Sequence, residues 1–255
     1  MVNTQEIIWI AFVLMFGSLV NGAVGFGIGL ICIPLLVLGG VTLPEAIAVM
    51  LVTMLFANGL SCYHYRKHLH WRSILPVLVF HLIALPLGVL TLFYLDELDE
   101  QLTKSVVGVF VLLAVGLQLF LQIKPRERLS SGWGCAAGLT SGYIESLVGM
   151  GSPPLILYMM AHKWDANRMR TFIWFIFLVD IAPMLFLLWY SFGNQIAYAT
   201  VVGVLCFPMT MLGTRLGNGL GHTMGAVRLR RIAYSILIFL GFTSVAMPLM
   251  RYGTT

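Results

Sequence analysis

Charged side chains are scarce in this sequence. Asp, Glu, Lys and Arg together make up 10% of the 255 residues, against about 25% in an ordinary soluble domain. A water-soluble protein of this size would need many more charges to cover its surface, and no hydrophilic block is long enough to form a separate soluble domain. Apolar residues instead make up 59% of the chain, and the mean hydropathy is +0.93.

Signals for metal, disulfide and catalytic chemistry are also missing from the sequence. The cysteines Cys32, Cys62, Cys135 and Cys206 lie in apolar stretches without a CxxC pair, which argues against a metal site or a disulfide framework. There is no HExxH, GxSxG or Walker motif. We therefore predict no catalytic residue, no cofactor and no enzymatic activity. A cleavable signal peptide is not expected either, because no Lys or Arg precedes Arg66.

Apolar runs recur along the whole chain, each of about 20 residues, which is the length of a membrane-spanning helix. Six of them lie between polar breaks, near residues 44–63, 73–95, 102–123, 170–190, 195–217 and 230–250. The predicted fold class is therefore an all-α polytopic membrane protein, with the lipid bilayer as its surroundings. The basic residues lie in short loops between these runs, so the net charge of +5 reflects topology, and nucleic acid is not an expected partner.

Two further apolar stretches, residues 7–39 and 132–161, are too long for one crossing. A helix over residues 7–39 would measure roughly 50 Å by its rise per residue, whereas the hydrocarbon core is about 30 Å thick. Each stretch carries glycines near its middle that should break a helix. The first break reads NGAVGFGIG from Asn21, and the second reads ESLVGMGSPP from Glu145.

The two breaks also resemble each other. VGFG from Val24 matches VGMG from Val148, about half the chain length further on, and each break precedes an apolar half-helix and three crossings. We therefore predict two homologous halves, residues 1–124 and 125–255, within one transmembrane domain. The half-helices should run from about Ile28 to Leu38 and from Ser152 onward. In the second, prolines suit the first turn and Ser152 can cap it.

The distribution of basic residues among the loops predicts the topology, because cytoplasmic loops carry excess Lys and Arg. Four loops are basic: they hold Arg66, Lys67 and Arg72; Lys124, Arg126 and Arg128; Lys163, Arg168 and Arg170; and Arg215, Arg228, Arg230 and Arg231. All four fall on one side only if each broken segment is a re-entrant hairpin. The two halves are then inverted, each with one hairpin and three transmembrane helices. We predict this arrangement in the inner membrane, with both termini periplasmic; full crossing of the broken segments is the alternative.

The two breaks are also the predicted substrate site. Each half-helix should present free N–H groups and a positive dipole end near the membrane midplane, and such ends bind anions. The substrate-binding candidates are therefore Asn21, Gly25, Phe26 and Gly27 in the first break, and Gly149, Met150, Gly151 and Ser152 in the second. Close helix contact through small residues is the alternative explanation for these glycines.

Polar side chains inside apolar spans are costly and therefore mark functional candidates. Glu145, Asp180, His81 and Asn58 lie in such spans and are candidates for coupling transport to an ion gradient, although each could instead serve structural pairing or helix packing. Arg170 and Arg215 lie near the ends of apolar runs. They could bind an incoming anion or extend to the membrane surface.

Residues 21–34 and 138–158 resemble the duplicated motif of the TauE/SafE family, a Gly-rich break followed by an apolar stretch that often contains Pro. Chain length and loop layout agree, so the resemblance covers nearly the whole chain. The first motif is less glycine-dense than is usual in the family, and the second carries Glu145 and a Pro pair. The resemblance implies a secondary transporter that exports sulfite, organosulfonates or related sulfur-containing anions.

Two other functions fit the same sequence features. An anion channel could use the same paired half-helices, and the chain could be a non-catalytic membrane subunit of a larger complex. The sequence leaves open which small anion is the substrate, which ion drives its movement, and whether the chain forms a homodimer.

Overall fold

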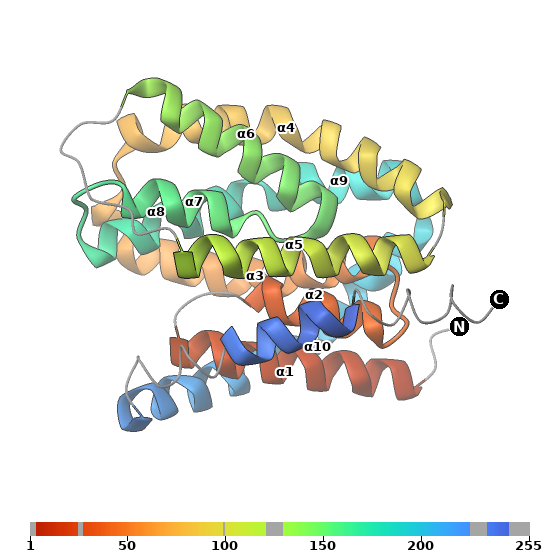
Figure 1. Cartoon of the computed structure of the whole chain (residues 1–255). Helices are drawn as coiled ribbons and strands as arrows, with labels where there is room; N and C mark the ends of the chain where they lie inside the picture. Colours follow the sequence, from red (N-terminus) through yellow and green to blue (C-terminus); the bar gives the residue numbers. More distant parts are fainter. Residues whose placement is uncertain (1–3, 25–27, 99, 121–129, 225–233, 245–255) are drawn as a thin grey trace. The chain divides into compact units, whose positions relative to one another are not determined.

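The structure is a computed structural model, and it describes residues 4–24, 28–98, 100–120, 130–224 and 234–244 (Figure 1). Every regular element in these ranges is a helix, which confirms the predicted all-α class. Four helical stretches are long and apolar enough to cross a bilayer: Thr4–Ala23, Trp71–Asp96, Ala166–Phe192 and Asn194–Gly217. The chain is therefore a multi-pass helical membrane protein.

The helices follow the apolar runs of the sequence closely. The first half of the chain forms α1 (Thr4–Val24), α2 (Ile28–Leu38), α3 (Leu43–Tyr65), a short 3-10 turn (Arg66–His68), α4 (Trp71–Leu98) and α5 (Glu100–Phe120). The second half forms α6 (Ser131–Val148), α7 (Ser152–Met160), α8 (Ala166–Val179), α9 (Ile181–Phe192), α10 (Asn194–Met224) and a shorter apolar helix, Tyr234–Ser244. Each predicted crossing thus coincides with a helix or, for residues 170–190, with the pair α8 and α9.

The predicted second break is confirmed, and its backbone explains it. α6 ends at Val148 because Gly149 adopts a left-handed conformation with φ of 68°, and its N–H donates to Glu145 O at 2.8 Å. Gly can adopt this conformation without the steric cost of a Cβ. α7 begins at Ser152 with prolines in its first turn. The predicted Ser152 cap is wrong, because Ser152 is already helical and the capping position is Gly151, without a side-chain bond.

The first broken stretch agrees in its bounds with the sequence prediction. α1 ends at Val24 and α2 covers Ile28–Leu38, while Gly25, Phe26 and Gly27 lie outside the described residues. α1 is longer than the half-helix expected of a hairpin arm. Its 21 residues measure about 31 Å at the helical rise, so this arm alone has the length of a crossing.

The crossing predicted over residues 170–190 is divided at Asp180. α8 ends at Val179, Asp180 forms a bend, and α9 begins at Ile181. Pro183 accounts for this division, because a proline has no N–H for the carbonyl four residues earlier and its ring presses against that carbonyl, here Val179. The bend leaves the Asp180 side chain in the interior, where it is 0% exposed.

The helices group into two compact units, each drawn from both halves of the chain. The first unit comprises residues 1–53, 95–116 and 197–255, and the second unit comprises residues 54–94 and 117–196. The division into repeat halves concerns sequence order and stays a prediction. The core of the second unit holds side chains from α4, α7 and α8, namely Ile74, Val77, Leu78, Leu155, Met159, Phe172 and Ile176.

Glycines allow close helix contact inside each unit. In the second unit, a Cβ added at Gly138 or Gly142 of α6 would meet the backbone of α4. In the first unit, a Cβ added at Gly213 or Gly217 of α10 would meet the backbone of α1. Small residues let membrane helices approach this closely. α4 is the second crossing after the break in the first half, and it lies against α6, the first arm of the broken segment of the second half. In the same way, α10 of the second half lies against α1, the first arm of the broken segment of the first half.

Candidate functional site

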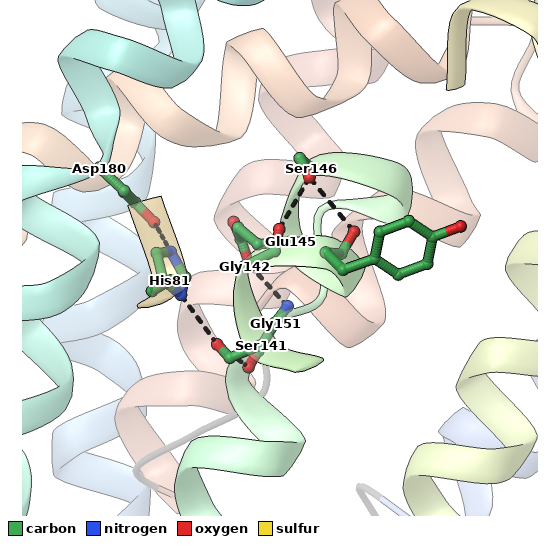
Figure 2. Close-up of polar contacts among 8 residues, drawn as sticks. His81, Ser141, Gly142, Glu145, Ser146, Gly151 and Asp180 are labelled. Carbon is green, nitrogen blue, oxygen red and sulfur yellow. Dashed lines mark hydrogen bonds and ion pairs between the residues drawn. The ribbon is translucent and has the colours of Figure 1, made fainter. Parts of the chain in front are cut away.

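Buried polar side chains of the second unit gather at the break between α6 and α7 (Figure 2). His81 comes from α4, Ser141 and Glu145 from α6, and Asp180 from the bend between α8 and α9. His81, Ser141 and Asp180 are 0% exposed and Glu145 is 9% exposed. Burial of so many polar groups is unfavourable unless they bond to one another, and here they form a connected network.

The peptide units around Gly151 are held by two side chains of α6. The N–H of Gly151 donates to Glu145 Oε2 at 2.6 Å, and the hydroxyl of Ser141 donates to Gly151 O at 2.7 Å. A Cβ added at Gly151 would lie 2.5 Å from Ser141 O and 2.7 Å from Glu145 Cβ. Glycine is therefore required at this position for steric reasons, and the shape of the break depends on Ser141 and Glu145.

The network continues from Ser141 to the imidazole of His81 and on to Asp180. His81 Nδ1 lies 3.2 Å from Ser141 Oγ, and His81 Nε2 lies 2.9 Å from Asp180 Oδ2. Figure 2 shows the imidazole between the two side chains. Asp180 Oδ1 is buried and has no hydrogen-bond partner among the described residues. The carboxyl of Asp180 is thus tied to the helix break through one imidazole and one hydroxyl.

Two local features bring these side chains together. The contact of Gly142 with the backbone of His81 fixes the approach of α4 and α6. The bend before Pro183 sets the position of Asp180. The Asp180 side chain makes no cap bond at the start of α9 and contacts His81 instead.

The hydrogen-bonded cluster contains two acidic side chains and one imidazole, and no described Lys or Arg side chain takes part in its bonds. Among these residues, only a protonated His81 would carry positive charge. Within the described part of the chain, no group of three or more His, Cys, Asp or Glu side chains is arranged to hold a metal ion. The arrangement is suited to binding and moving a proton.

The predicted site residues are distributed unevenly around this cluster. Glu145, Gly151, His81 and Asp180 belong to it, and Met150, with 2% exposure, is buried in the same break. Gly149 and Ser152 are half-buried at its two edges.

The other candidates lie apart from these hydrogen bonds. Asn58 is buried on α3 at 6% exposure, Arg170 is exposed on α8, and neither takes part in the bonds of the cluster. In the first unit, Asn21 is half-buried on α1 and Arg215 is exposed on α10. The candidates Gly25, Phe26 and Gly27 are outside the described residues.

Ser141 is the one functional side chain that the sequence did not single out. It lies four residues before Glu145, so the two share a face of α6. That spacing next to an acidic residue in an apolar span was the available signal, but a serine in a membrane helix most often bonds its own helix. Ser146 does so, donating to Gly142 O at 2.7 Å, whereas Ser141 bonds across the break.

The N-terminus of α7 offers fewer free N–H groups than expected. Pro153 and Pro154 have no N–H, and the N–H of Gly151 is already bonded to Glu145. A carboxyl oxygen thus lies where the positive end of the helix dipole favours negative charge. An incoming anion would have to compete with Glu145 for this position.

Comparisons with known proteins agree with one another. The family model described as "Sulfite exporter TauE/SafE" matches residues 10–244 of the chain. A protein of Cupriavidus necator, described as "Probable sulfite/organosulfonate exporter TauE", is 26% identical over 237 residues, which are 91% of this chain and 90% of that protein. No solved structure matches the chain.

Proposed function

Because this chain belongs to the TauE/SafE family of sulfite exporters, we propose that it is a secondary transporter that exports small sulfur-containing anions. Sulfite and organosulfonates are the substrate class named for the Cupriavidus necator relative, and that class extends to this chain as part of the proposal. The coupling site would lie in the second unit, at the break between α6 and α7.

One observation carries the assignment of this break. Its amide at Gly151 already donates to a carboxyl oxygen of Glu145 at 2.6 Å, inside the protein and next to the start of α7. Sulfite and sulfonates carry the same kind of acceptor oxygen, and charge-assisted bonds from backbone N–H groups are among the stronger hydrogen bonds. We therefore propose that substrate replaces Glu145 at this amide during the transport cycle.

The repeat of the two halves supports the same function. Broken helices in matching positions of two inverted halves are the common plan of secondary transporters. α4 of the first half packs against the broken segment of the second half, and α10 of the second half packs against the broken segment of the first half. A duplicated architecture would produce this reciprocal packing. In this proposal the first break also contributes to the binding of substrate, in the first half of the chain.

The finer topology belongs to the same proposal. The chain would lie in the inner membrane with its basic loops cytoplasmic and both termini periplasmic, as the distribution of Lys and Arg favours. The breaks would lie near the membrane midplane, where non-helical backbone is tolerated only if it is buried in protein or lines a cavity. The short backbone stretch Gly149–Gly151 meets the first of these conditions within the second unit.

Anion binding can be tested on detergent-purified protein by thermal stabilisation. A ligand that binds only the folded state stabilises it by RT ln(1 + [L]/Kd), about 2.7 kcal/mol at 100 times Kd. For a chain of this size that corresponds to a rise of about 5–11 °C in Tm. Sulfite, a sulfonate and a carboxylate of similar size should be compared, and we expect the sulfur anions to raise Tm.

Two glycine variants locate the effect within the chain. Gly151→Ala places a Cβ 2.7 Å from Glu145 Cβ and should abolish the ligand-induced shift. Gly132→Ala, near the start of α6, meets no atom closer than 3.9 Å and should leave the shift unchanged. An equal shift in both variants would separate anion binding from the break and remove the site from the proposal.

A further inference from the structure

We propose that His81 and Asp180 form the proton-binding site of this transporter, and that Ser141 transmits their protonation state to the carbonyl of Gly151 in the helix break. The proposal rests on the transport function assigned above and adds to it the coupling ion, the residues that bind it and the bond through which it acts. It is argued from the directions in which the hydrogen bonds of the cluster must run.

The first step is the direction of the bond between Ser141 and His81. A serine hydroxyl has one proton, and that of Ser141 is donated to Gly151 O, which can only accept. Toward His81 Nδ1, 3.2 Å away, the Ser141 oxygen must therefore be the acceptor. It follows that Nδ1 of His81 carries a proton in this conformation.

The second step concerns the other ring nitrogen. If Nδ1 carries the only ring proton, Nε2 is an acceptor, and an ionised Asp180 is also an acceptor only. Two acceptors would then face each other at 2.9 Å, with both side chains 0% exposed. A proton must lie between them, either on the carboxyl of Asp180 or on an imidazolium. In both forms the pair holds one exchangeable proton and is neutral overall.

The third step is the consequence of losing that proton. From the imidazolium form, His81 can release its Nδ1 proton to water that reaches the break, and the electron pair of the N–H bond stays on Nδ1. Nε2–H then continues to donate to the anionic Asp180. Nδ1 has become an acceptor, so the hydroxyl of Ser141 turns to it and no longer bonds Gly151 O. A buried carbonyl without a partner is unfavourable, so the break is released.

The protonated pair thus holds the break in the observed shape, and the deprotonated pair frees it. Gly151 remains attached through its N–H to Glu145 alone. Because loss of the proton leaves the pair negative, repulsion between Asp180 and an ionised Glu145 also weakens the contact of Glu145 with the break.

Other ionisable side chains on the surrounding helices do not compete for this role. Arg72, Tyr94, Arg170 and Tyr190 are exposed. Tyr143 bonds Thr91, while Arg168 bonds Ser73 and lies over the ring of Trp164. Phe177 packs against the imidazole, with ring centroids 6.2 Å apart. Among the described residues, Glu145 is the further acid joined to this network, and a pH experiment on the pair must control for it.

The described residues in the corresponding part of the first unit include no such pair. Asn21 stands where Glu145 stands in the second break, and Gly17 stands where Ser141 stands. The one carboxyl on α1 is Glu6, in the first turn of that helix. The assignment of proton binding to the second unit therefore follows from residues that the two halves do not share.

The experiment measures the affinity of purified protein for methanesulfonate, whose charge does not change near neutral pH, across a pH series. Coupled sites typically change each other's affinity about 5- to 150-fold, and we expect a ratio in this range between the protonated and deprotonated pair. In Asp180→Asn the amide can donate to Nε2 permanently, which imitates the protonated pair. The ratio should then fall to about one.

Ser141→Ala separates proton binding from its effect. The pair should still titrate, visible in infrared difference spectra as a protonated-carboxyl or imidazolium band that disappears at high pH, while the affinity ratio falls to about one. Thr140→Ala is the matched control, because the Thr140 hydroxyl is exposed and bonds carbonyls of its own helix. It should behave like the wild type, and Glu145→Gln should keep a pH-dependent affinity.

The outcomes distinguish this inference from the proposed function. Wild-type pH dependence in Asp180→Asn or Ser141→Ala would overturn the switch while leaving anion transport intact. If wild-type protein does not bind methanesulfonate, infrared titration still decides the proton site. A titrating carboxyl or imidazolium band that is absent in Asp180→Asn supports it, and the absence of both bands in the wild type overturns it.

Discussion

The contact between α4 and α6 at Gly142 predicts that alanine at this position is less stable than alanine at an unobstructed helical glycine. The new Cβ would lie 2.8 Å from the carbonyl carbon and 2.9 Å from Cα of His81, with the carbonyl oxygen closer still. Carbon atoms in ordinary contact are about 3.5–4.0 Å apart, so α4 would have to move by at least about 0.7 Å. The obstruction is backbone, which cannot turn aside as a side chain can.

The cost can be set against a control in a helix with open space. Overpacking of this kind typically costs about 1–3 kcal/mol. Gly116 on α5 has no atom within 4 Å of an added Cβ, so Gly116→Ala receives only the gain in helix propensity, about 1 kcal/mol. Gly142→Ala receives the same gain, and the difference between the variants isolates the steric term. It corresponds to about 2–12 °C in Tm.

A thiol-reactive dye is a suitable assay, because Cys32, Cys62 and Cys206 are buried and become reactive on unfolding. Cys62 lies in the same unit as Gly142, and Cys32 and Cys206 lie in the same unit as Gly116, so the dye follows the unfolding of both variants. We expect Gly142→Ala to unfold below Gly116→Ala. Equal Tm values would refute the close approach of α4 and α6 and, with it, the position assigned to His81.

Three further substitutions test the local geometry of the second unit. Gly149→Ala should lower stability by about 1–2 kcal/mol, since an L-residue is strained at φ of 68°, and Gly149→Asn should lose less; thermal unfolding compares them. Pro183→Ala should change Tm little, because Pro183 lies in the first turn of α9, where proline is tolerated, yet it should lower anion efflux from proteoliposomes by removing the bend at Asp180. Asp165→Ala should lower Tm at neutral pH. The Arg168 N–H depresses the pKa of Asp165, so the stabilisation is present above the ordinary carboxyl pKa and disappears as pH falls through the depressed one; Tm against pH measures this.

The helical plan of the chain was predictable from its sequence, for physical reasons. Apolar runs in lipid must satisfy their own backbone hydrogen bonds, which leaves the helix as the available element. Glycine clusters in over-long runs then mark where a helix ends, and the predicted start of α2 at Ile28 and of α7 at Ser152 agree with the structure.

The division of α8 from α9 was less visible in the sequence. A proline after an acidic residue in an apolar run indicates a bend, but many helices continue past proline with a kink. The outcome here depends on His81, which accepts Asp180 as a partner in the interior. That partner is 99 residues away in sequence, and no local pattern indicates it.

The sequence indicated the residues of the candidate site one at a time but not their connection. Rules of burial single out Glu145, Asp180 and His81 one at a time, because each is costly in an apolar span. Their connection into one network depends on Ser141, which bonds both Gly151 and His81, and on the contact of Gly142 with the backbone of His81. Serine and glycine are common in membrane helices, so their functional positions emerge only from the folded chain.

The most direct test of the central claim is efflux of radiolabelled sulfite and methanesulfonate from proteoliposomes that contain the purified chain alone. The account predicts saturable efflux that Gly151→Ala abolishes and Gly132→Ala preserves. Flux that rises without saturation would instead indicate a channel. No flux above that of empty liposomes, from protein that unfolds cooperatively at its normal Tm, would contradict the proposal that this chain is itself an exporter of sulfur-containing anions.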